Sequence, residues 1–164
     1  MFRYSLVWDK SQTTGFLNAK RQPLRRHEDI LLFYKLQPTY NPIMRKGKMI
    51  LKNTGNDTTT YNHSIAMPHY SEDYYPTSII DIPQVRVKDG HPTQKTVPLF
   101  SYLIKTYTNE GDLVLDTCAG SCTTGLAAIQ TGRKYICIEK EQKYCEMGQK
   151  RINKWKSGDI FFQE

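Results

Sequence analysis

Two acidic residues stand at the ends of two apolar runs in the C-terminal part of the sequence. Asp116 ends the run 113–116, and Glu139 ends the run 135–139. Glu139 follows Asp116 by 23 positions, close to the ~20-residue offset at which an acid holds ribose hydroxyls in doubly wound sheets. Small residues at 117–122 form a turn before a predicted helix, whose first N–H groups face that turn. This spacing predicts a ligand that contains a ribose.

The glycines of the turn argue against the commoner nucleotides. Gly120 and Gly125 have the spacing of a phosphate-binding loop, but Leu126 stands where such a loop needs Lys. Ser121 and Cys122 do not provide the middle glycine of a dinucleotide fingerprint. A phosphate-free adenosine ligand fits better. Taken alone, the two glycines fit an ordinary strand-to-helix turn equally well, and the acid pair favours the ligand site.

A second motif, His-Pro-Thr-Gln-Lys at 91–95, precedes a predicted amphipathic helix. Together with the turn and the two acids, it closely resembles the S-adenosylmethionine site of DNA amino-methyltransferases. The resemblance implies these cofactor-binding residues: His91, Thr93, Gln94, Lys95, Asp116, Gly120, Ser121, Thr123, Thr124 and Glu139.

The resemblance also implies a role for each part of the site. Asp116, Gly120 and Ser121 would line the methionine end of the cofactor, Glu139 would hold the ribose, and 93–95 would close over the methionine portion. One departure lies in the turn, where Cys122 replaces the family's usual glycine. A Cβ is costly at a position that needs a positive φ or a close ligand approach, so we expect reduced cofactor affinity.

The order of parts resembles the permuted, beta-type group of that family. We therefore expect the remaining strands of a catalytic half at 1–36, a target-recognition insert at 37–90 and the S-adenosylmethionine-binding half at 91–164, in one globular domain overall. The expected fold class is α/β, a Rossmann-like methyltransferase sheet that is incomplete at its N-terminal catalytic part.

The family's catalytic tetrapeptide is absent from the sequence. An exocyclic amino nitrogen is a poor nucleophile, so the enzyme must supply hydrogen-bond acceptors and an aromatic face for the extruded base. The family does so with Asp or Asn, Pro, Pro and an aromatic residue. The nearest string, Asn-Pro-Ile-Met at 41–44, lacks the second proline and the aromatic residue. We assign no catalytic residue and expect a missing N-terminal segment that carries the motif.

Positive charge is concentrated at the front of the chain. Residues 1–53 contain 11 Lys and Arg against three acids, a net charge of +8, whereas the whole chain carries +7. Such a patch is the electrostatic footprint of phosphate contacts, although a solvated basic surface is the alternative. The resemblance favours DNA, and the candidate DNA-binding residues are Lys20, Arg21, Arg25, Arg26, Arg45, Lys46 and Lys48.

Periodicity and turn residues predict the elements that position these motifs. We expect strands at 4–8, 30–34, 113–115 and 135–138, the last two buried and parallel, and helices at 97–107, 123–130 and 142–155. Alternating strands and helices predict a three-layer sheet, and the absent catalytic strand would leave one edge open. The aromatic residues of the insert either stack on bases or cover a small core, and the sequence leaves both interpretations open.

Several classes of protein are disfavoured. The chain has no apolar stretch near ~18 residues and no signal peptide, so we expect a cytoplasmic protein without a membrane partner. The four cysteines and four histidines lack the spacing of a metal site, so we assign no metal and expect free thiols.

Three hypotheses of function follow. The first is an S-adenosylmethionine-dependent DNA methyltransferase directed at adenine, in which this chain supplies cofactor and DNA binding. The second is a remnant or subunit that binds DNA or cofactor without turnover, paired with a separate N-terminal polypeptide or with a second copy. The third, which we rank last, is a methyltransferase of RNA or protein.

Overall fold

The computed structural model describes residues 1–52, 69–85 and 94–158. They form two compact units. The larger unit consists of Met1–Asn41 and Ser78–Glu164, and the smaller unit is Pro42–Thr77.

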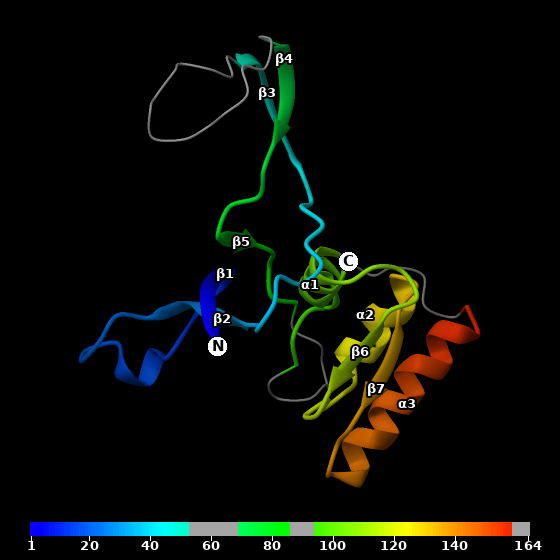
Figure 1. Ribbon diagram of the computed structural model, residues 1–164. Helices are drawn as coiled ribbons and strands as arrows, with labels where there is room; N and C mark the ends of the chain where they lie inside the picture. Colours follow the sequence, from blue (N-terminus) through cyan, green and yellow to red (C-terminus); the bar gives the residue numbers. More distant parts are fainter. Residues whose placement is uncertain (53–68, 86–93, 159–164) are drawn as a thin grey trace. The chain divides into compact units, whose positions relative to one another are not determined.

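A hairpin begins the larger unit. Strand β1 (Phe2–Thr14) pairs antiparallel with β2 (Arg25–Phe33), and the short strand β5 (Ile79–Asp81) runs parallel to β1 on its other edge (Figure 1). A single 3-10 turn, η1 (Phe16–Asn18), lies in the connection between β1 and β2. The strands predicted at 4–8 and 30–34 are therefore confirmed, and both begin earlier than predicted.

Alternate residues of β1 build the first core. Leu6 and Trp8 point to the same side of the strand because side chains alternate along it, and they pack with Ile80 and with Leu99 of helix α1 (Val97–Tyr107). Trp8 is only 1% exposed. Helix α1 has the predicted bounds, and Pro98 occupies its first turn, where the missing N–H costs nothing.

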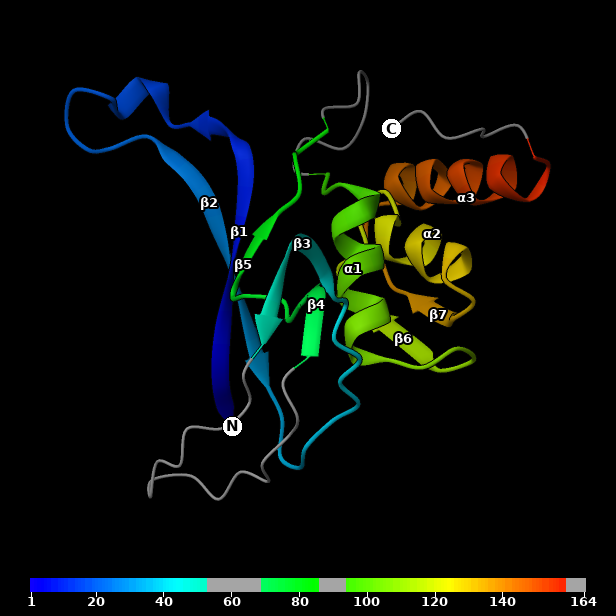
Figure 2. The same cartoon turned by 90° about the horizontal axis from the view of Figure 1, so that it is seen from above.

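The second sheet of this unit carries the predicted cofactor motifs. Strands β6 (Leu113–Asp116) and β7 (Lys134–Cys137) are parallel and are joined through helix α2 (Thr123–Gln130), as the sequence predicted. Helix α3 (Gln142–Lys156) follows β7. Figure 2 shows α2 and α3 on one side of the two strands.

Small side chains let the helices approach each other closely. Ala127 and Ala128 of α2 are completely buried and pack against Ile104 of α1. Phe100 of α1 packs against both this cluster and the first core. Helix α1 therefore holds the β1 hairpin and the β6–β7 sheet in one unit.

The prediction that β6 and β7 are parallel is confirmed, but the prediction that they are buried is wrong for one of their two faces. Leu113 and Leu115 are each 58% exposed, and Ile136 is 47% exposed. Val114 and Tyr135, on the opposite face, pack against the helix cluster. The described helices cover one face of these strands only, so the predicted three-layer arrangement is not formed by the described residues.

The smaller unit contains an antiparallel hairpin of β3 (Arg45–Lys52) and β4 (His69–Tyr74). The Tyr74 ring lies over Gly47, where an added Cβ would come within 2.7 Å of it, and the Tyr74 hydroxyl donates to the Lys48 carbonyl at 2.7 Å. The predicted insert, 37–90, contains this unit, and its two limits stay a prediction. None of the helices in the described ranges is long and apolar enough for a bilayer crossing.

Candidate functional site

Parallel pairing brings the two predicted acids to the same edge of the β6–β7 sheet. Asp116 lies opposite Cys137 in the strand register. Ile138 N–H donates to the Asp116 carbonyl at 2.8 Å, and Ala119 N–H donates to the Ile138 carbonyl at 3.0 Å. The segment that follows β7 is therefore hydrogen-bonded to the end of β6 and to the turn at 117–122, as expected at the carboxyl ends of parallel strands.

The Asp116 carboxylate holds the turn from one side. One of its oxygens accepts the Cys118 N–H at 3.0 Å, and the other accepts the Thr124 hydroxyl. These contacts connect the end of β6 to the first turn of α2, which fixes the path of the backbone between them.

The Glu139 carboxylate holds the same turn from the other side. One oxygen accepts the Gly120 N–H at 2.7 Å, and the other accepts the Glu141 N–H at 2.9 Å. The two carboxylates therefore meet on one turn, each as an acceptor of backbone N–H groups.

The turn itself is closed by a residue that the sequence analysis missed. Arg151 of α3 donates from Nη1 to the Ser121 carbonyl at 2.6 Å, to the Ser121 hydroxyl at 3.0 Å and to the Thr123 hydroxyl at 3.1 Å. Burial lowers the pKa of the Arg151 guanidinium. Ser121, Thr123 and Thr124 are at most 6% exposed, so their side chains bind protein atoms and shape the turn.

The described end of the His-Pro-Thr-Gln-Lys motif contacts the turn directly. The Ser121 hydroxyl donates to Gln94 Oε1 at 2.7 Å, and the Thr123 hydroxyl lies 3.5 Å from the Lys95 carbonyl oxygen. The Lys95 ammonium points instead to Glu28 of β2, at 2.5 Å. Of the predicted cofactor residues, His91 and Thr93 lie outside the described residues.

Cys122 adopts a positive φ, which is one of the two alternatives that the family's glycine left open. Its φ is 59° and its ψ is 40°, a left-handed conformation that costs a non-glycine residue about 1–2 kcal/mol. Two glycines make room for its side chain, because a Cβ on Gly125 would lie 2.5 Å from the Cys122 Sγ and a Cβ on Gly148 would lie 2.7 Å from the Cys122 Cβ. A hydrogen bond with Cys137 lowers the pKa of the Cys122 thiol to about 7.

The predicted DNA-binding residues fall into two groups, one in each unit. Lys20, Arg21 and Arg25 are exposed around the connection that enters β2, whereas Arg26 donates to Asp9 at 2.8 Å. In the other unit Arg45 and Lys48 are exposed.

Lys46, in the same hairpin as Arg45 and Lys48, is paired with two acids. Its ammonium lies 2.7 Å from Glu72 and 2.9 Å from Asp73. Those hydrogen bonds raise the pKa of Lys46. Two carboxylates therefore already offset the charge of this ammonium.

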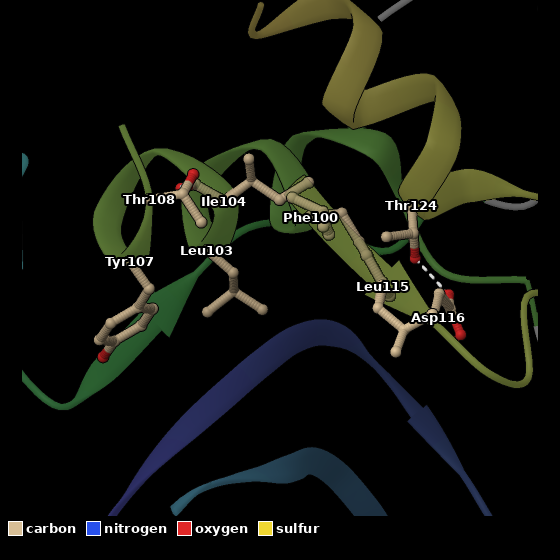
Figure 3. Close-up of a pocket in the computed structure, with 9 residues that line it drawn as sticks. Phe100, Leu103, Ile104, Tyr107, Thr108, Leu115, Asp116 and Thr124 are labelled. Atoms are coloured by element: carbon tan, nitrogen blue, oxygen red, sulfur yellow. Dashed lines mark hydrogen bonds between the residues drawn. The ribbon is translucent and has the colours of Figure 1, made fainter. Parts of the chain in front are cut away.

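An apolar groove of about 320 Å³ lies between α1 and β6 (Figure 3). Tyr107 and Thr108 stand at one end of it, and Asp116 with Thr124 stands at the other. Phe100, Leu103, Ile104, Val114 and Leu115 complete its lining. Among the described strands, β6 pairs with β7 alone, so its second edge is open.

A parallel β6–α2–β7 unit, with an acid at or just after the end of each strand, is typical of α/β proteins that bind nucleotide-type ligands. The profile of the N6_N4_Mtase family, described as DNA methylase, matches residues 1–150, and the chain belongs to this family. The family resemblance predicted from the sequence is thereby confirmed.

The most informative relatives are longer than this chain. It is 34% identical over 155 residues to the DNA adenine methyltransferase YhdJ of Escherichia coli K12, which covers 90% of this chain and 51% of YhdJ. The chain therefore spans about half the length of that relative.

Solved structures give the same fold. The crystal structure of the M1.HpyAVI–SAM complex is 26% identical, with a TM-score of 0.61 over 93% of this chain and 63% of that chain. The PvuII cytosine-N4-specific DNA methyltransferase is 19% identical, with a TM-score of 0.63 over 90% of this chain and 49% of its own. The predicted Rossmann-like fold is confirmed, and the predicted cofactor is the ligand named in the first of these complexes.

Proposed function

We propose that this chain binds S-adenosylmethionine and supplies the cofactor-binding half of a cytoplasmic DNA methyltransferase that modifies an exocyclic amino group. The observation that carries the proposal is the meeting of Asp116 and Glu139 on one turn. When bound, S-adenosylmethionine supplies a methyl group on a cationic sulfur. In this proposal Glu139 accepts the ribose hydroxyls, and Asp116 with Gly120 and Ser121 borders the methionine end.

Adenine is the proposed base, because a relative that aligns with 90% of this chain is named as an adenine methyltransferase. In this proposal the exposed basic side chains of Lys20, Arg21 and Arg25 hold the DNA. Arg45 and Lys48 form a second group of such side chains. Contacts of this kind position a protein on the phosphate backbone and carry no sequence information themselves. The recognition of a target sequence therefore needs other groups.

The acceptor site for the base comes, in this proposal, from a separate polypeptide or from a second copy of the chain. The 164 residues contain no Asp- or Asn-Pro-Pro-aromatic string. The groove beside the open edge of β6 supports a partner, because the exposed Leu115 and the buried face of α1 meet there, next to Asp116. A partner that covers this apolar surface would stabilise the complex, because burial removes the surface from water.

A second function is favoured by the same missing tetrapeptide. In it the chain is a remnant or regulatory subunit that binds DNA or S-adenosylmethionine without turnover. Both functions use the same cofactor site, so only a transfer assay separates them.

The test is transfer of a labelled methyl group to DNA, followed by separation of N6-methyladenine from N4-methylcytosine. The chain is assayed alone and with the product of any neighbouring reading frame that encodes the tetrapeptide, and Asp116→Ala is the control. Transfer that requires the partner supports the enzyme. Binding of both ligands without transfer favours the remnant, and robust transfer by the chain alone would place the catalytic group within it.

A further inference from the structure

Glu28 on β2 is shared by two lysines. Its Oε1 lies 3.2 Å from the Lys10 ammonium, and its Oε2 lies 2.5 Å from the Lys95 ammonium. The Lys10 side chain is only 8% exposed, whereas those of Glu28 and Lys95 are 34% and 36% exposed. A buried ammonium needs an anionic partner. One oxygen of Glu28 therefore pairs with the buried Lys10, and the other pairs with Lys95.

The Lys95 ammonium is fixed from a second direction. It lies 5.6 Å from the centroid of the Trp8 ring, a distance at which the ring face attracts a cation. Trp8 is itself immobilised by burial and by the hydrogen bond from its Nε1 to the Ile82 carbonyl at 2.7 Å. The ammonium is thus held between a carboxylate and an aromatic ring of the β1 hairpin.

The backbone of Lys95 and its neighbour connect this anchor to the turn between β6 and α2. Gln94 Oε1 accepts the Ser121 hydroxyl, and the Lys95 carbonyl lies close to the Thr123 hydroxyl. Arg151 binds Ser121 from the opposite side. The turn is therefore hydrogen-bonded to α3 through Arg151. It is also connected, through residues 94–95, to the β1 hairpin.

We propose that Glu28 is a positioning residue of the cofactor site, which holds Lys95 so that Gln94 and the Lys95 carbonyl keep the Ser121–Thr123 segment in its binding geometry. This inference rests on the proposed S-adenosylmethionine site. Glu28 acts through Lys95 and does not itself touch the cofactor. The neighbouring ion pair of the same hairpin, between Asp9 and Arg26, makes no hydrogen bond or ion pair with residues 94–95 or with the turn within residues 1–52, 69–85 and 94–158, so Asp9 provides a matched control.

The test measures S-adenosylmethionine binding to the full chain by calorimetry. Glu28→Gln alone leaves Lys10 buried without a partner, so it is combined with Lys10→Met, and Lys10→Met alone is the reference. We expect the double variant to bind on the order of tenfold more weakly than Lys10→Met, about the value of one charge-assisted hydrogen bond. Asp9→Asn, which breaks the Arg26–Asp9 pair, should bind like the wild type.

Lys95 supplies a second arm that does not disturb the buried lysine. Lys95→Met should bind S-adenosylmethionine about tenfold more weakly than the wild type. Lys95→Arg keeps a cation within reach of Glu28, so it should recover most of that affinity. Adding Lys95→Met to the double variant should cause no further loss, because residues that act as one unit are not additive. A merely structural role for Glu28 would not produce this rescue and this non-additivity.

The outcomes separate the two proposals. Wild-type binding with unchanged affinity in the double variant and in Lys95→Met would overturn the role of Glu28 and leave the cofactor site standing. Absence of binding by the folded wild-type chain would overturn the proposed function, and this inference with it. If the double variant does not fold, as circular dichroism would show, the comparison of Lys95→Met with Lys95→Arg decides alone.

Discussion

The turn between β6 and α2 and the basic connection that enters β2 were both selected from the sequence, yet they differ in how firmly the structure holds them. In the turn, the side chains of Asp116, Ser121 and Thr124 are bonded to other protein groups. In the connection, Lys20 and Arg21 are exposed. A site for a small ligand needs a preorganised geometry, whereas contact with a phosphate backbone needs mainly positive charge.

The largest expected effect is on the turn. Arg151→Met removes a cation that makes three hydrogen bonds to Ser121 and Thr123. Hydrogen bonds to charged groups contribute about 1.5–3 kcal/mol each. We therefore expect the free energy of unfolding, measured by urea denaturation, to fall by about 2–3 kcal/mol. The free energy of unfolding of Arg151→Lys should lie between those of the wild type and Arg151→Met. A variant as stable as the wild type would show that the turn is held without α3.

Glu28→Gln should have the next largest effect on stability. Burial alone would raise the pKa of Glu28, but the hydrogen bonds from Lys95 and Lys10 hold it below its ordinary 4.5. The carboxylate therefore adds stability above that value, and the stability is lost as the pH falls through the lowered pKa. With its side chain 34% exposed, we expect a loss of about 1–2 kcal/mol at pH 7.

Urea denaturation at several pH values checks this expectation. The difference in unfolding free energy between the wild type and Glu28→Gln should shrink as the pH falls below 4.5. A difference that stays constant down to pH 3 would contradict the assigned ion pair.

Cys122 tests the cost of strain inside the turn. Cys122→Gly and Cys122→Ala both remove the thiol, but only glycine relieves the positive φ of 59°. We expect the glycine variant to be about 1 kcal/mol more stable than the alanine variant, and to bind S-adenosylmethionine more tightly than the wild type. Equal stability of the two variants would mean that the turn relaxes around alanine.

Substitutions in the basic connection should barely affect stability. Arg21→Gln and Arg25→Gln are expected to change the unfolding free energy by less than about 0.5 kcal/mol. Each should weaken DNA binding and reduce its salt slope by about 1. Lys46→Gln is the matched control, because Glu72 and Asp73 already offset the charge of Lys46 and so weaken its attraction to a phosphate. Equal effects of all three would contradict the division between free and paired cations.

Local pattern predicted much of this molecule. The bounds of α1 followed from its apolar spacing and Pro98, and the turn followed from small residues between two strand-ending acids. Glu28 and Arg151 were missed because their partners are far away in the sequence, where no local period points to them. The open face of β6 and β7 was missed because an apolar run such as 113–115 looks the same whether or not another element covers it.

One measurement tests the central claim most directly, namely the affinity of the chain for S-adenosylmethionine after isosteric removal of each acid. Asp116→Asn and Glu139→Gln should each weaken binding by about tenfold or more, a loss of about 1.4 kcal/mol, while Arg21→Gln binds normally. Affinity that stays unchanged in both acid variants would contradict the assignment of these two carboxylates to the ligand.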